Sequence, residues 1–98
     1  MWILTVKNED GWTPLLRASE NGHVEVVKRL IQAGGEVNAQ IKEGYWKGET
    51  TLHHASRYGH VEVITALLAA GADKTIKDNK DRTPHDLAEN QDCKNALE

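Results

Sequence analysis

Short apolar stripes recur along this chain of 98 residues at the spacing of amphipathic helices. Each stripe has a one-three-one spacing, which places its members on a single face of a helix. A glycine, Gly34 or Gly71, follows each stripe and is suited to end the helix. The pattern therefore predicts two equivalent helices. Their apolar positions are Val26, Val27, Leu30 and Ile31 in the first, and Val63, Ile64, Leu67 and Leu68 in the second.

A shorter helix is predicted before each of these stripes. Thr13 and Thr50 are suited to begin it, because a threonine hydroxyl can accept from the free N–H groups of a first turn. Pro14 fits the first helical position, where the missing N–H costs nothing. Gly22 and Gly59 then follow, and a left-handed glycine ends a helix without steric strain. Each predicted unit is thus a pair of short helices.

The two predicted helix pairs are copies of one another. GHVEV occurs at Gly22–Val26 and again at Gly59–Val63, a shift of 37 residues, and a degraded third copy follows at a shift of 33. A single unit cannot bury its own stripe, so successive units must stack. We expect the rings of His23 and His60 to bond neighbouring backbone and to join the units.

Two long segments carry a family resemblance. GWTPLLRASENGHVEVVKRLIQAGGEVNA and GETTLHHASRYGHVEVITALLAAGADKTI resemble the ankyrin repeat, a unit of about 33 residues with T-P-L-H and G-H signals. The resemblance implies an all-α ankyrin-repeat solenoid of stacked helix-turn-helix units with extended, β-hairpin-like fingers. It divides the chain into a partial repeat or cap at 1–10, a repeat with a lengthened finger at 11–47, a second repeat at 48–80, and a degraded capping repeat at 81–98.

The ends of the chain leave alternatives open. By register, Ile3–Val6 corresponds to Asp73–Ile76, the tail of a repeat whose helices are missing. The chain is therefore either a fragment of a longer array or a domain in which Trp2, Ile3, Leu4 and Val6 form a substitute cap. Trp2, Ile3 and Leu4 could instead pair with another copy, so a homo-oligomer formed through this end is an alternative to the expected monomer.

The resemblance implies a non-catalytic module that binds another protein on a concave face. In the family, contacts tend to come from the finger tips, the residue before the capping threonine and the end of the first helix. Several of these positions here hold Trp, Tyr or Arg, which dominate binding hot spots. The predicted partner-binding residues are Trp12, Glu20, Asn21, Tyr45, Trp46, Lys47, Glu49, Arg57, Tyr58 and Arg82. The alternative for Trp12 and Tyr58 is packing on adjacent units.

The link between the two full repeats is longer than the link that follows it. Gly11 and Gly48 are 37 residues apart, whereas Gly48 and Asp81 are 33 apart. We predict that Glu43-Gly44 turns the chain and that Tyr45-Trp46-Lys47 returns it, which gives a lengthened finger at 41–47. Loops held on a rigid scaffold are common binding sites. The alternative is that Tyr45 or Trp46 folds back on the finger or on a neighbouring loop.

Composition narrows the remaining classes of function. The net charge of −3 and the mixing of both signs argue against a nucleic-acid partner. No apolar segment approaches the roughly 20 residues that a membrane-spanning helix needs. The one cysteine, Cys93, excludes an internal disulfide and favours a reducing compartment. We expect a cytoplasmic protein, with the nucleus or a host-cell cytosol as alternatives.

Two chemical alternatives have candidate residues. His53 and His54 beside Ser56 suggest a catalytic cluster, but His53 occupies a framework position of the resemblance and Ser56 a small packing position. The candidate zinc ligands, none in a paired motif, are His53, His54, His60, His85 and Cys93. We expect no enzymatic activity, no cofactor and no metal site.

Overall fold

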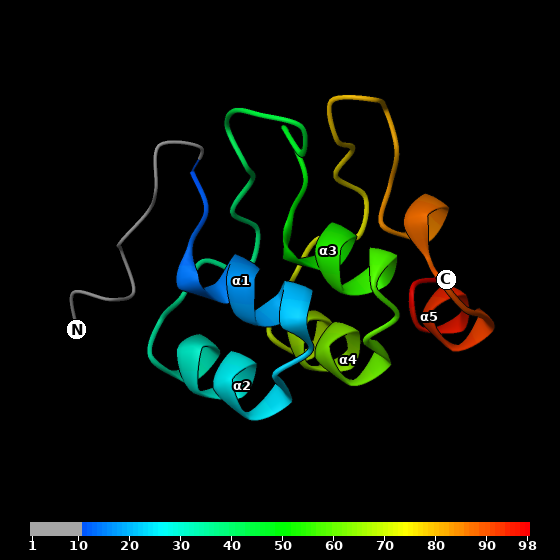
Figure 1. The fold of residues 1–98 in the computed structure, drawn as a ribbon. Coiled ribbons are helices and arrows are strands. Elements are labelled where there is room, and N and C mark those ends of the chain that lie inside the picture. Colours follow the sequence, from blue (N-terminus) through cyan, green and yellow to red (C-terminus); the bar gives the residue numbers. More distant parts are fainter. Residues whose placement is uncertain (1–10) are drawn as a thin grey trace.

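Paired helices alternate with long loops through residues 11–98, the part of the chain that the computed structural model describes (Figure 1). No strand occurs within those residues, in agreement with the all-α prediction. The elements are α1 (Pro14–Asn21), α2 (Val24–Gln32), α3 (Thr51–Arg57), α4 (Val61–Ala69), the 3-10 helix η2 (His85–Leu87) and α5 (Gln91–Ala96). None of the helices in this part of the chain is long and apolar enough to cross a membrane.

The predicted caps begin and end the helices. The hydroxyl of Thr13 accepts from the N–H of Leu16 at 3.2 Å, and that of Thr50 accepts from the N–H of His53 at 3.4 Å. Pro14 is the first residue of α1. Gly22 ends α1 with φ of 71°, and a side chain there would lie only 2.6 Å from the ring of His60. Gly22 is therefore required by both its backbone conformation and the close approach of the next unit.

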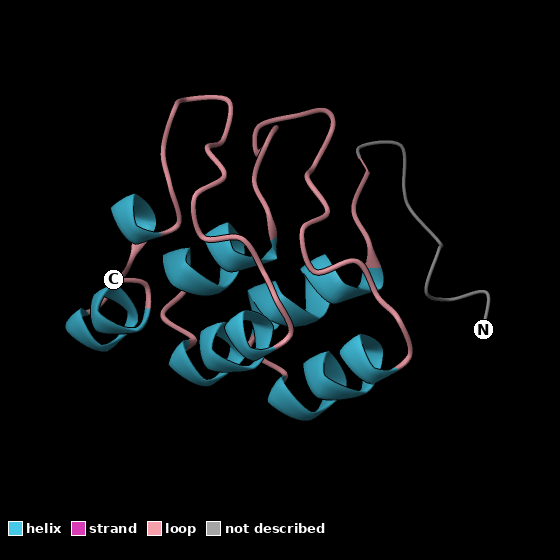
Figure 2. Ribbon diagram, turned by 180° about the vertical axis from the view of Figure 1, so that it is seen from behind, coloured by secondary structure: helices cyan, strands magenta, loops and turns pink. Residues whose placement is uncertain are grey.

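The helices form two layers, from which the loops project together (Figures 1 and 2). α1 and α3 make the inner layer beside the loops, and α2 and α4 make the outer layer. Neighbouring units contact helix to helix, α1 on α3, α2 on α4 and α4 on α5. We refer to the loop at 37–50 as the long finger and to the loop at 74–83 as the third finger.

One apolar core runs through the stack. Val27, Leu52, Val63 and Leu67 are completely buried in it, and Leu30, Ile31 and Leu68 are partly buried against it. The predicted stripe of α2 is wrong at one position, because 46% of Val26 is exposed. α2 contacts the next unit on one side, whereas α4 has helices of the stack on both sides.

Polar side chains join successive units through the backbone. The Nε2–H of His60 donates to the carbonyl of Glu20 at 2.9 Å, which confirms its predicted role. The hydroxyl of Ser56 donates to the carbonyl of Pro84 at 2.5 Å, and the N–H of Glu89 donates to the carbonyl of Ser56 at 3.0 Å. The same prediction for His23 is wrong, since its side chain is exposed and has no such bond within residues 11–98.

The third unit is reduced, as its irregular sequence predicted. Its first helix shrinks to the single 3-10 turn η2, and the short α5 follows. The side chains of Cys93 and Leu97 are buried in the common core, while Gln91, Asp92 and Asn95 are exposed. The outer side of this unit is therefore polar. The exact division of the chain into repeats stays a prediction, and the predicted partial repeat at 1–10 lies outside the described residues.

Candidate partner-binding surface

The extra residues of the long finger lie at its tip. The N–H of Ile41 donates to the carbonyl of Glu49 at 3.0 Å, and the matching bond in the third finger runs from Asp78 to Arg82 at 2.9 Å. Seven residues separate the bonded pair in the long finger, but only three do in the third finger. Gly48 and Asp81 are both left-handed, with φ of 87° and 64°. The two fingers thus share a base, and the insertion changes only what stands above it.

The inserted residues turn back on themselves, as predicted, although no strand forms. Gly44 has φ of 88°, the N–H of Lys47 donates to the carbonyl of Gly44 at 3.2 Å, and the N–H of Gly48 donates to the carbonyl of Ile41 at 2.7 Å. The carbonyl of Lys47 then accepts from the N–H of Asn79 at 3.1 Å. This last bond joins the tip of the long finger to the third finger.

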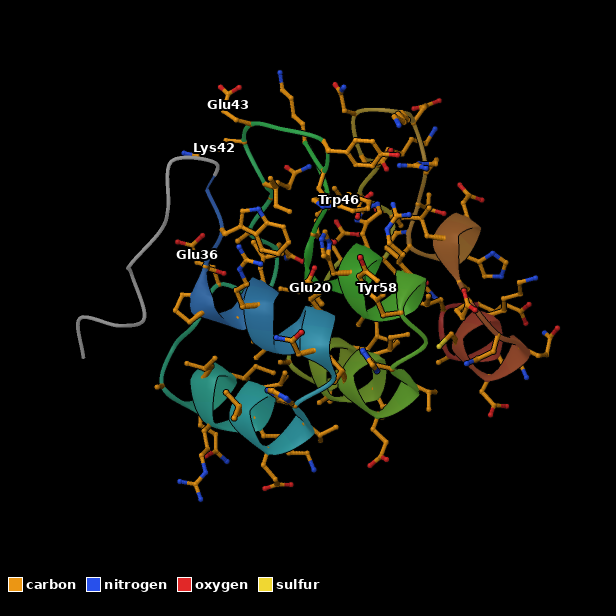
Figure 3. The ribbon with its side chains drawn as sticks, in the orientation of Figure 1. Glu20, Glu36, Lys42, Glu43, Trp46 and Tyr58 are labelled. Carbon is orange, nitrogen blue, oxygen red and sulfur yellow. The ribbon has the colours of Figure 1, made fainter. Side chains whose placement is uncertain are left out.

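Tyr45 and Trp46 have different surroundings. Tyr45 is 74% exposed, and its ring packs edge-on against Trp46 at 4.6 Å and lies 4.8 Å from the Nζ of Lys80. Trp46 is partly buried, with the guanidinium of Arg57 stacked 4.4 Å from its ring. Figure 3 shows Lys42 and Glu43 at the tip of the finger, and Trp46 lower down, towards α3. Trp46 therefore anchors the finger, and Tyr45 projects from it.

The buried carboxylate of Glu49 lies beneath Trp46 and Arg57. Glu49 is 1% exposed, and its Oε2 accepts from Arg57 and, at 3.3 Å, from Arg82. Its Oε1 lies 3.2 Å from Nδ1 of His54, although neither of these two atoms makes a regular hydrogen bond. Burial raises the pKa of Glu49, but His54 and Arg57 outweigh burial and hold that pKa below its ordinary value of 4.5. Glu49 is thus an internal anion that organises the cations around it.

Asp78 plays a similar part in the third finger. Its carboxylate accepts from the backbone N–H groups of Lys80 and Arg82 and from the Nε of Arg82, each at 2.9 Å. Burial raises its pKa, but the hydrogen bonds from Arg82 and Lys80 prevail, so the pKa lies below 3.8. Arg82 is therefore held between two buried carboxylates.

The predictions for Trp12 and Glu49 as direct contacts need correction. Trp12 is only 8% exposed and packs in a second apolar cluster with Leu16, Ala39 and Ile41. Its ring also meets the ring of His54 edge-on at 4.8 Å and the guanidinium of Arg17 at 4.2 Å. Both side chains support the surface from within the stack. The alternative of packing on an adjacent unit is the one that holds for Trp12.

The other predicted residues fall into two groups. Tyr45, Trp46, Lys47, Arg57 and Arg82 lie together at the fingers, with Tyr58 at the end of α3, 42% exposed. Glu20 and Asn21 end α1 in the preceding unit, where Glu20 pairs with Arg17 at 3.5 Å. We define the finger–helix surface as Tyr45, Trp46, Arg57, Tyr58, Lys80 and Arg82.

The sequence analysis did not identify His54 and Asp78 as residues that support the candidate binding surface. His54 is completely buried, with the rings of Trp12, Trp46 and Tyr58 around it at 4.8, 5.6 and 6.3 Å. Its one signal in the sequence was a second histidine directly after the framework position. Asp78 could have been recognised from its place before a short turn, where a carboxylate often accepts from backbone two residues on.

Most residues of the chemical alternatives have structural roles here. The N–H of Thr50 donates to Nδ1 of His53 at 3.0 Å, so the Nε2–H of His53 donates to the carbonyl of Arg82 at 2.8 Å. Ser56 is engaged with Pro84. Cys93 is buried, which raises the pKa of its thiol above 9.0. Within residues 11–98, no three His, Cys, Asp or Glu side chains are grouped to hold a metal ion.

Comparisons with known proteins agree with the fold. A family model described as ankyrin repeats (3 copies) matches residues 3–78. The ankyrin repeat domain of Bcl-3, described as a unique member of the IkappaB protein family, superposes with a TM-score of 0.85 at 33% identity. That match covers 97% of this chain and 40% of the Bcl-3 chain.

Two curated relatives match over shorter stretches. Alpha-latrocrustotoxin-Lt1a of Latrodectus tredecimguttatus is 46% identical over 37 residues, which are 38% of this chain and 3% of the toxin. Ankyrin repeat domain-containing protein 49 of Bos taurus is 47% identical over 36 residues, 37% of this chain and 15% of that protein. The matches thus span a small part of each relative.

Proposed function

The chain belongs to the ankyrin-repeat family, and from that premise we propose that it is a non-catalytic module that binds another protein through its concave face and the lengthened finger at 41–47. Ankyrin repeats are generally protein–protein interaction modules, and the family is typically non-enzymatic. A reducing, cytoplasmic location is part of the proposal, because the lone Cys93 is a free thiol.

One observation carries the proposal, namely the exposed ring of Tyr45 on a finger that is anchored to the stack. A large exposed aromatic ring loses little conformational entropy on binding when its backbone is already fixed. The backbone here is fixed by the bonds of Ile41, Gly48 and Asn79, and by Trp46 under Arg57. Nothing in the stacking of the repeats requires Tyr45, so a binding role explains its position best.

In this proposal some of the remaining predicted residues contact the partner directly, and others position the residues that do. Tyr58 and Arg57 extend the contact from the finger onto the end of α3, and Lys47 and Arg82 supply charge. Glu20 and Asn21 would meet the edge of the partner. Trp12 and Glu49 act indirectly, since they hold the ring of His54 and the two arginines in place.

The test is a chain whose long finger is cut to the length of the third finger. Replacing Lys42–Lys47 with Asn-Lys leaves Gly48 in place and gives a three-residue tip like that at 79–81. We expect the variant to lose proteins that the natural chain captures from a lysate of the source cells, as measured by quantitative mass spectrometry. The exposed Val26→Ala, on the outer layer, serves as the matched control and should capture the same set.

A second variant protects the test against misfolding. Tyr45→Ser with Tyr58→Ser keeps the length of the finger and the buried Trp46, so its unfolding midpoint should stay close to that of the natural chain. If both finger variants capture the same proteins as the natural chain, the long finger is not the binding site.

A second candidate function is self-association, or a structural part within a longer array. Two observations favour it. One is the exposure of Val26 on α2 and of His23 at the start of α2, and the other is the small share of each relative that the chain matches. Sedimentation over a range of concentrations tests self-association. A monomer at every concentration, unchanged by Val26→Glu, would exclude it.

A further inference from the structure

The finger–helix surface has its anions inside and its cations outside. The side chains of Glu49 and Asp78 are each 1% exposed, whereas those of Arg57 and Arg82, which bond to them, are 23% and 33% exposed. Each guanidinium uses part of its donor set on a buried carboxylate. The exposed part of each side chain faces solvent, although Nε of Arg57 is buried without a hydrogen-bond partner among residues 11–98. An approaching group therefore meets the guanidinium edges before the carboxylates behind them.

Charge is also divided between the fingers and the helical body. The long finger (37–50) and the third finger (74–83), together with Arg57, hold seven cationic and four acidic side chains, and two of those acids are the buried Glu49 and Asp78. The rest of the described chain, residues 11–98, holds four cationic and nine acidic side chains. Lys42, Lys47 and Lys77 line, together with Glu36 and Asp78, an open cleft of about 610 Å³ between the two fingers. The fingers are thus the positive part of an acidic domain.

Aromatic rings pack on two of the cations. Arg57 lies over the ring of Trp46 and Lys80 over the ring of Tyr45, while the ring of Tyr58, at the end of α3, lies 6.3 Å from that of His54. Arginine and lysine stacked on aromatic rings keep their hydrogen-bonding edges free for carboxylates, while the rings offer apolar contact. Such a surface suits a segment in which acidic residues flank an aromatic or aliphatic side chain.

We infer that the finger–helix surface binds an acidic segment of the partner protein, with carboxylates at Arg57, Arg82 and Lys80 and an apolar side chain between Tyr45 and Tyr58. This inference rests on the proposed function and specifies its partner. Complementary charge speeds association and rejects partners of the wrong sign. A nucleic acid fits less well, because a long polyanion would also face the acidic helical body.

The experiment selects peptides from a random display library on the immobilised natural chain. Peptides that lose binding to the Tyr45→Ser/Tyr58→Ser variant are the ones that use this surface. We expect these to be enriched in Asp and Glu around an aromatic or aliphatic residue. Neutral or basic peptides that depend on Tyr45 and Tyr58 would overturn the acidic inference and leave the proposed function standing. A selection that yields no such peptide overturns the inference as well.

Charge reversal sharpens the result with a matched control. Lys47→Glu with Lys80→Glu changes two exposed lysines of the fingers, and Lys28→Glu with Lys94→Glu makes the same change on the helical body. With a selected acidic peptide at low salt, we expect association with the finger variant to slow about tenfold and association with the body variant to change little. Equal slowing in both variants would contradict a local surface, and so would tighter binding of a labelled single-stranded DNA than of the peptide.

Failure of the proposed function has a different signature. In that case the shortened finger captures the same proteins from lysate as the natural chain, whatever peptides the library yields. The lysate experiment therefore tests whether the finger binds at all, and the peptide selection tests what it binds.

Discussion

The first and second repeats place the same residues in different environments. Val26 and Val63 stand at the same position of the shared GHVEV motif, yet Val26 is 46% exposed and Val63 is completely buried. His60 bonds the carbonyl of Glu20 across the unit boundary, whereas His23 has no such bond within the described residues. The difference arises because, among residues 11–98, α4 has helices of the stack on both sides whereas α2 has one only on the side of the next unit. A residue of a repeat is buried by its neighbours, so its burial cannot be read from its own unit.

The largest expected contrast involves the leucines of the outer helices. Leu67 is completely buried, so Leu67→Ala should lower the free energy of unfolding by about 2–5 kcal/mol. Leu30 occupies the equivalent position but is only partly buried, and Leu30→Ala should cost less. Urea unfolding of both variants gives the two values. Equal losses would mean that the first repeat is as enclosed as the second.

The valines of the shared motif give a second contrast. Val63→Ala removes two buried methyl groups, and at about 0.8 kcal/mol for each carbon plus a cavity term it should cost about 2 kcal/mol. Val26→Ala should stay within about 0.5 kcal/mol of the natural chain, as is usual for exposed positions. Urea unfolding of the two valine variants measures this difference in stability. A large loss at Val26 would show that this position is covered in solution.

The histidines of the same motif test the bond between units. His60→Ala removes the donor to the carbonyl of Glu20 and the ring that packs on Gly22, so we expect a loss of about 1–2 kcal/mol. His23→Ala should be close to neutral. Thermal unfolding of the two variants side by side measures the difference. A neutral His60→Ala would contradict a stabilising role for this bond.

The smallest expected effect concerns pH. Burial lowers the pKa of His53 below its ordinary value of 6.5, against the opposing hydrogen bond to the carbonyl of Arg82. The unfolded chain then binds a proton more readily than the folded chain. The stability from neutral His53 is therefore complete above about pH 6.5 and is lost as the pH falls from there towards the lowered pKa.

The equivalent residue in the first repeat supplies the control. Leu16 fills that position without a titrating group, so His53→Leu should flatten the dependence of the unfolding midpoint on pH between about 7 and 5. The carboxylates with lowered pKa values, such as Glu49 and Asp78, titrate below this range. An unchanged slope in the variant would assign the effect to another group.

Sequence reasoning predicted the helices well because local signals determine them. Thr13, Thr50 and Gly22 cap helices through bonds and backbone angles that involve only nearby residues. The turn of the long finger at Gly44 is local in the same sense. The repeat in the sequence further predicted the stacking, since copies that share an apolar stripe share the need to cover it.

The surface was harder to predict because it depends on distances between repeats. Glu49, Arg57 and Arg82 were each predicted to contact a partner, and the structure instead brings Glu49 underneath the two arginines. Arg82 is 33 residues from Glu49 in the chain, so no local pattern indicates their contact. Trp12 was misplaced for the same reason, since the ring of His54 that covers it belongs to the next repeat.

The sequence by itself determined the repeat, its helix caps, the all-α fold and the four-residue insertion, because each of these depends on residue type and spacing along one chain. Only the tertiary structure decided which aromatic side chain of the finger is anchored and which is exposed, and which charges are buried. Those outcomes depend on how neighbouring units exclude water from one another. Tyr45 projects and Trp46 anchors because Arg57 and His54, from the next helix, lie under one ring and not the other.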